Sequence, residues 1–233
     1  MVVIDEVPYL TRAGSDFEGA LQAAWDRVLS QLPVLLILVG SNRAEMERLT
    51  SYDRPFYMRG TEMELGPLTV ADVAERTGLP AADAIDAYLV SGGLPLILSE
   101  WKRGTKVATF IKQAISDPLS ALHVSGERAL TAEFPTETHT RTILEAIGSG
   151  ETTFTKIARR TQVPDSSLER ALKALTERRL IVAEQPISTA VSKLTRYRIE
   201  DPYLRFWLAF CAGRIPTVEA GRSDVVVAGV EAR

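Results

Sequence analysis

The sequence predicts an α/β region followed by an all-α region, and three observations support this fold class. Two apolar runs, residues 2–4 and 34–39, flank an amphipathic segment at residues 17–29, and the second run lacks the polar alternation of a half-exposed strand. A strand, a helix and a strand in this order form half of a parallel sheet. From Thr69 the apolar residues recur at helical spacing, which predicts a helical lid. Residues 142–199 then show three helices and two short strands, a pattern typical of a winged helix-turn-helix.

The composition is that of an ordinary globular chain, with 45% hydrophobic residues, 24% charged residues and a formal net charge of −3. The charge is unevenly distributed. Residues 1–100 contain 15 acidic and 7 basic side chains, a balance of −8, whereas residues 136–200 contain 8 acidic and 11 basic ones, a balance of +3. This asymmetry predicts that the two parts have different partners.

Cysteine usage and hydropathy exclude several classes of protein. Cys211 is the only cysteine, so an intramolecular disulfide is excluded and a reducing compartment is favoured. The longest apolar run, residues 33–39, is too short to span a bilayer. Asp5 and Glu6 stand where a signal peptide carries basic residues. The sequence therefore predicts a cytoplasmic protein with no membrane partner.

Polar side chains follow both predicted strands at their carboxyl ends. The first strand ends in Asp5-Glu6, and the second ends in Gly40 followed by Ser41-Asn42. The carboxyl ends of parallel strands meet at one edge of an open sheet, where ligands collect. An apolar strand that closes on two carboxylates is the Walker B pattern of P-loop ATPases, although an exposed acidic pair at a strand end is the structural alternative. The phosphate-binding sequence GxxxxGK[ST] does not occur in the 233 residues.

Four passages, taken together and in this order, resemble one protein family. They are Val-Ile-Asp-Glu-Val-Pro-Tyr-Leu at residues 3–10, Leu-Val-Gly-Ser-Asn at 38–42, Arg-Pro-Phe-Tyr-Met-Arg at 54–59 and Ser-Gly-Gly-Leu-Pro-Leu at 91–96. With them the chain resembles the archaeal-type ATPases of the STAND and AAA+ group, in the branch that carries a C-terminal winged helix and then a DUF234-type region. The resemblance implies the C-terminal half of a P-loop NTPase sheet, with ATP and Mg²⁺ as the cofactors of the intact family.

The resemblance assigns roles to the strand-end residues. Asp5 would hold Mg²⁺ through its water shell, and Glu6 would be the catalytic carboxylate that polarises the attacking water. Ser41 or Asn42 resembles the sensor position, a neutral donor that reaches the γ-phosphate or the lytic water. The alternative for both is an N-cap of the following helix, a position that serine and asparagine favour.

The two later passages contribute three more candidates. Arg59 matches an arginine that would neutralise phosphate charge as a second catalytic residue, and its alternative is a surface ion pair. Gly93 and Pro95 match the Gly-Leu-Pro-Leu signature, in which the proline would pack on the adenine ring. Their alternative is an ordinary helix stop, because glycine and then proline are common after a last helical turn.

We expect four parts along the chain. They are a partial ATPase core at residues 1–66, a helical lid at 67–134, a winged-helix domain at 135–211 and the start of a further C-terminal region at 212–233. Because the Walker A half is missing, this interpretation predicts a fragment of a longer gene or a misplaced start codon, and a chain that does not hydrolyse ATP alone. A sheet without its P-loop strand has uncovered edges and apolar faces, so self-association is also predicted.

The second candidate site lies in the predicted winged helix, whose recognition helix is expected to begin near Asp165. Exposed basic and hydroxyl side chains of this helix and the preceding one are the candidates for DNA contact: Lys156, Arg159, Arg160, Ser166, Ser167, Arg170 and Lys173. The balance of +3 is modest for phosphate binding, and Glu169 and Glu177 share the recognition helix. The sequence therefore leaves two functions open for this module, regulatory DNA binding and protein contact.

Overall fold

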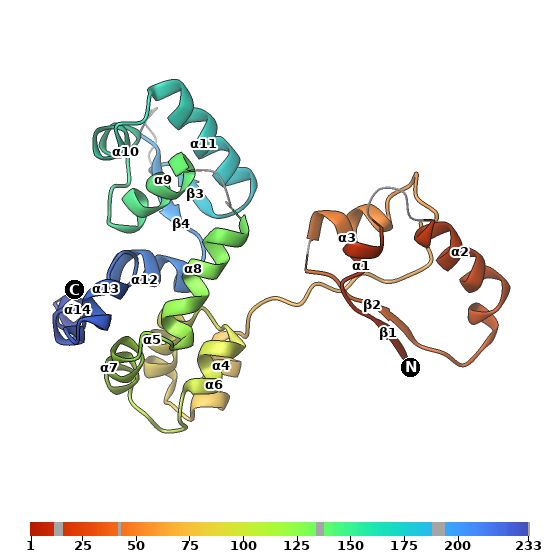
Figure 1. Ribbon diagram of the computed structural model, residues 1–233, viewed down its shortest axis with the longest axis horizontal. Coiled ribbons are helices and arrows are strands. Elements are labelled where there is room, and N and C mark those ends of the chain that lie inside the picture. Colours follow the sequence, from red (N-terminus) through yellow and green to blue (C-terminus); the bar gives the residue numbers. More distant parts are fainter. Residues whose placement is uncertain (12–15, 42, 134–137, 188–193, 233) are drawn as a thin grey trace. The chain divides into compact units, whose positions relative to one another are not determined.

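The computed structural model describes residues 1–11, 16–41, 43–133, 138–187 and 194–232, and it divides into two compact units (Figure 1). The first unit is Met1–Leu65 and the second is Gly66–Arg233. The boundary falls next to the expected end of the α/β part. The three parts expected after it share one unit, because a single apolar core extends from Val73 to Val227.

The first unit contains the predicted parallel strand pair. Strand β1 (Val2–Ile4) pairs with β2 (Leu36–Leu38), and Val3 lies opposite Ile37. The helical elements around the pair are α1 (Val7–Leu10), α2 (Phe17–Arg27), the 3-10 turn η1 (Leu29–Gln31) and α3 (Arg43–Leu49). The strand–helix–strand order inferred from the two apolar runs is therefore confirmed.

The second strand has the continuous apolar run that is typical of a central parallel strand, but within this unit it is not buried on both faces. Leu36–Leu38 is only half-buried, and the flanking Leu35 is 60% exposed. On β1, Val2 and Val3 are 46% and 51% exposed. Two strands with little helical cover cannot bury the apolar side chains that a fully covered parallel sheet would bury. This uncovered surface fits the predicted self-association, which stays a prediction.

The second unit begins with the helices of the expected lid. They are α4 (Val70–Thr77), α5 (Ala81–Ser91), α6 (Pro95–Glu100), α7 (Val107–Ser116) and α8 (Ala121–Glu133). A capping box starts α4: Asp72 donates its backbone N–H to the Thr69 hydroxyl, and the Thr69 backbone N–H donates to the Asp72 carboxylate. Trp101 and Phe110 stack in the core of these helices, with ring centroids 3.9 Å apart.

The next elements have the arrangement of a winged helix, as predicted. Helices α9 (Thr138–Gly148), α10 (Phe154–Thr161) and α11 (Asp165–Glu177) precede the antiparallel strands β3 (Ile181–Glu184) and β4 (Arg196–Ile199). Thr153, directly before α10, forms a further β-bridge with Arg196. Leu168, Leu172 and Leu175 are buried, so the opposite face of α11 is exposed to solvent. Helix α11, the expected recognition helix, begins at Asp165, as predicted.

The chain ends in α12 (Pro202–Phe210), α13 (Ile215–Glu219) and α14 (Ser223–Glu231). Helix α12 is central to the second unit, where it packs against α5, α8 and α9 (Figure 1). Trp207 is fully buried against Gly126 of α8, and its indole N–H donates to the His123 carbonyl at 2.8 Å. The winged helix and the lid are therefore joined through one aromatic helix rather than separated by a linker.

Candidate functional site

The structure brings the first group of candidates together at the carboxyl edge of the β1–β2 pair. The Val39 N–H donates to the Ile4 carbonyl at 2.9 Å, and the Val7 N–H donates to the Val39 carbonyl at 3.0 Å, which aligns the two strand ends. The Ser41 hydroxyl donates to both carboxylate oxygens of Glu6 at 3.4 Å. Residues 35 positions apart in the sequence thus form one polar edge.

The backbone of this edge has an unusual conformation. Glu6 has φ 51° and ψ 41°, a left-handed conformation that non-glycine residues rarely adopt, and its N–H donates to the Asp5 carboxylate at 2.8 Å. Such residues cluster at functional sites, where the surrounding structure holds the strain. Gly40 is required here, because a Cβ at this position would lie 2.6 Å from the Pro8 ring.

The metal role expected for Asp5 stays a prediction. Asp5 and Glu6 are both exposed at the strand end, as water-mediated Mg²⁺ binding would need. Within the described ranges, no group of three or more His, Cys, Asp or Glu side chains is arranged to hold a metal directly. Asn42, the other sensor candidate, lies outside the described residues.

Arg59 forms the ion pair that the sequence left open as its alternative. Its guanidinium donates to both Asp26 carboxylate oxygens, at 2.8 and 2.9 Å, and to the carbonyls of Pro55 and Tyr57 at 2.9 and 3.1 Å. The hydrogen bonds from Arg59 hold the pKa of Asp26 below its usual range. Asp26 was missed as a partner because 33 residues separate the two, and no sequence pattern links them.

The whole 54–59 passage is tied to α2. Arg54 forms an ion pair with the nearly buried Glu18, and Phe56 packs edge-on against Trp25 with ring centroids 6.3 Å apart. With the Arg59–Asp26 pair, these contacts give the passage a structural role inside the first unit. Its catalytic role is untested.

Gly93 and Pro95 lie in the second unit, and local packing accounts for the glycine. Gly92 and Gly93 have φ 60° and 71° at the end of α5, which is the helix stop that the sequence left open. A Cβ on Gly93 would lie 2.0 Å from the Leu68 carbonyl oxygen, and the Leu68 N–H donates to the Gly93 carbonyl at 2.9 Å. Pro95 is exposed in the first turn of α6, and its adenine contact stays a prediction.

The structure also groups the basic candidates of the winged helix. Lys156, Arg159 and Arg160 are exposed on α10, which contains no acidic residue and buries Ile157. None of these three cations forms an ion pair with another described residue. Positive charge is therefore concentrated on the exposed surface of α10, although the charge balance of residues 136–200 is only +3.

Helix α11 presents a mixed surface. Ser166, Arg170 and Lys173 are exposed on the side opposite its buried leucines, while Ser167 is half-buried. The Arg170 Nε donates to the Ser166 carbonyl at 3.3 Å, and Lys173 lies 3.9 Å from Glu177. On the wing, Arg198 pairs with Glu184 across the two strands. The basic groups of α11 and the wing are thus partly neutralised, whereas those of α10 are not.

No helix in the described part of the chain has the length and apolar character needed to cross a membrane.

Comparison with known proteins gives relatives but no function. No protein-family model matches the sequence. The chain is 28% identical over 231 residues to an uncharacterized protein of Methanocaldococcus jannaschii, in an alignment that covers 97% of this chain and 52% of that protein. The chain therefore spans about half the length of the curated relative it matches.

A solved structure also matches part of the chain. It is a zinc-responsive MarR family member, ZitR of Lactococcus lactis, with a TM-score of 0.26 and 15% sequence identity. The match covers 48% of this chain and 82% of that one. A TM-score this low does not indicate a shared fold.

Proposed function

We propose that the chain is a regulatory binding module whose winged helix contacts DNA through α10 and the exposed face of α11. The observation that supports this most directly is the set of Lys156, Arg159 and Arg160, which are exposed on a helix without acidic residues and form no ion pair within the described part of the chain. In helix-turn-helix proteins the recognition helix lies in the major groove and the preceding helix crosses the phosphate backbone. The cations on α10 are suited to phosphate contacts, and the hydroxyl groups on α11 are suited to hydrogen bonds in the groove.

The proposal assigns phosphate contacts to α10 and groove contacts to α11. Ser166, Arg170 and Lys173 are the groove candidates, because they are exposed, whereas Ser167 is half-buried. Glu169 and Glu177 on α11 oppose non-specific attraction to phosphate. We therefore expect moderate affinity with a clear dependence on salt.

Replacing Lys156, Arg159 and Arg160 together by glutamine is expected to lower the affinity for duplex DNA by roughly tenfold to hundredfold. Binding releases about one counterion for each phosphate that a cation neutralises. Without these three cations, the slope of log affinity against log salt is therefore expected to become less steep by up to about 2.7. Fluorescence anisotropy with a mixed-sequence duplex over a salt series measures both quantities.

A matched control is available in the same unit. Replacing the exposed Lys102, Lys106 and Lys112 by glutamine removes the same charge outside the winged helix and is expected to leave affinity and slope near those of the unchanged protein. Equal losses in the two triple variants, or no DNA binding by the unchanged chain, would refute DNA contact through α10. The protein-contact function would then be favoured.

We further propose that the first unit is an ATPase-derived nucleotide edge, as the resemblance implies. The Glu6–Ser41 contact at the aligned strand ends supports this second function, together with the exposed Asp5. Glu6 and Ser41 would face the γ-phosphate side, and Asp5 would hold Mg²⁺ through water. Without a GxxxxGK[ST] loop, the chain lacks the main phosphate ligands, so we expect binding without hydrolysis.

Calorimetry with a non-hydrolysable ATP analogue tests this second function. Weak binding that requires Mg²⁺ is expected, and Asp5→Ala is expected to weaken it by roughly tenfold because the metal loses its carboxylate. Asp53→Ala removes another exposed carboxylate of the same unit and serves as the control. Binding that is independent of metal, or equal in both variants, would contradict the assignment.

A further inference from the structure

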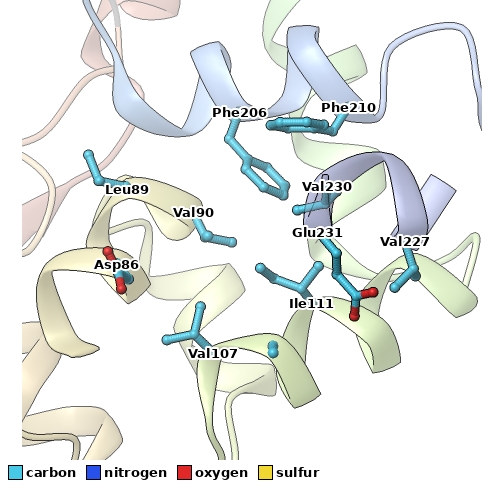
Figure 2. A pocket seen from close by; sticks show the side chains of 11 residues that line it. Asp86, Leu89, Val90, Val107, Ile111, Phe206, Phe210, Val227, Val230 and Glu231 are labelled. Carbon is cyan, nitrogen blue, oxygen red and sulfur yellow. The ribbon is translucent and has the colours of Figure 1, made fainter. Parts of the chain in front are cut away.

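A cavity of about 580 Å³ lies within the second unit, between α5, α7, α12 and α14 (Figure 2). Its walls are mainly aliphatic and aromatic, and Val90, Ile111, Phe206 and Val230 converge on its centre. The volume is in the range of small-molecule sites, about 300–1,000 Å³, which are typically apolar with a few placed polar groups. The cavity is partly open to solvent, and its volume suits a small molecule.

The polar groups of this cavity are of one kind. Among the described residues that line it, the only polar side chains are the carboxylates of Asp86 on α5 and Glu231 on α14. Figure 2 shows them on opposite sides of the cavity, with apolar side chains between them. Both are exposed, and neither forms an ion pair with another described residue. An anionic ligand would be repelled here, whereas a cation would be attracted.

The aromatic side chains add to the same preference. Phe206 and Phe210, with ring centroids 5.1 Å apart, form the α12 wall. Aromatic faces attract ammonium groups, and this attraction grows when the cation is partly removed from water. The rest of the wall offers only methyl and methylene groups, which favour an alkyl chain or ring.

We propose that this cavity binds a small cationic amphiphile, in which an ammonium group is attached to an apolar chain. The ammonium group pairs with Asp86 or Glu231, and the chain fills the space against Ile111, Phe206 and Val230. The site shares no residue with the basic surface of α10 or with the strand edge of the first unit, and it does not depend on either proposed function.

Calorimetry on the full chain with decyltrimethylammonium, below its micelle concentration, tests the proposal. We expect one molecule bound per chain, and much weaker binding of decanoate, which has the same chain length and the opposite charge. Tetramethylammonium, the head group alone, is expected to bind weakly because it lacks the apolar part. The double variant D86N/E231Q is expected to lose roughly fivefold to tenfold in affinity for the cation.

The variant D83N/D224N is the matched control, since it removes two exposed carboxylates from the same helices α5 and α14 outside the cavity. It is expected to bind as the unchanged chain does, and Ala108→Phe, which fills the cavity from α7, is expected to abolish binding. Equal affinity for the cation and decanoate, or equal losses in the two double variants, would overturn the proposal. Absence of cation binding by the unchanged chain would overturn it as well.

Discussion

Trp207→Ala is expected to destabilise the second unit by about 3–5 kcal/mol, the range for removing a fully buried large aromatic side chain. Trp207 has no exposed surface, its ring lies against Gly126, and its N–H donates to the His123 carbonyl. Truncation leaves a cavity at the centre of α12 and removes the indole hydrogen bond to the His123 carbonyl. Because α12 contacts the lid and the winged helix together, both should lose stability at once.

Urea unfolding followed by circular dichroism measures the loss of stability. The reactivity of the Cys211 thiol shows whether the second unit is the part that unfolds. Cys211 is fully buried directly after α12, and burial raises the pKa of its thiol to about 12, so it should react with thiol reagents only after unfolding. Trp207→Phe, which keeps an aromatic ring and loses the N–H donor, is the control and should cost clearly less. An unchanged midpoint in Trp207→Ala would show that α12 is not central to the core.

Gly93→Ala is expected to destabilise the same unit by roughly 2–4 kcal/mol, from two sources. The residue has φ 71°, which an alanine adopts at a cost of about 1 kcal/mol, and its new Cβ would lie 2.0 Å from the Leu68 carbonyl oxygen. That oxygen belongs to the backbone, so the chain before α4 would have to move.

Gly104→Ala separates the two sources. Gly104 has φ 80°, and no atom lies within 4 Å of the position that a Cβ would occupy there, so its substitution carries the conformational cost alone, about 1 kcal/mol. Thermal unfolding of the two variants gives the comparison. A Gly93→Ala variant as stable as Gly104→Ala would mean that the Leu68 contact is not tight and does not explain the glycine at this position.

The elements that local patterns specify were predictable from the sequence. The apolar runs at 2–4 and 34–39 formed a parallel pair, and the leucine spacing of residues 168–175 placed the recognition helix and its buried face. Gly92 and Gly93 ended α5 as their position after a helical segment implies. These features depend on contacts within a few residues or on side-chain periodicity, which a sequence displays directly.

The sequence alone did not show which residues partner one another at long range. Arg59 meets Asp26 because the 54–59 passage folds back on α2, and the second strand is half-exposed because β1 is its only strand neighbour within the described residues. The sequence also did not show that α12 joins the lid helices and the winged helix in one core; the expected division of residues 67–233 into three parts stays a prediction.

The sequence by itself thus determined the strands, the helix-turn-helix and the polar residues at the strand ends, because each follows from local composition and period. Only the tertiary structure decided that Glu6 meets Ser41, that α10 keeps its cations unpaired among the described residues, and that Asp86 and Glu231 border one apolar cavity. The physical reason is that these arrangements depend on how distant segments pack, and packing is set by the whole core rather than by any one segment.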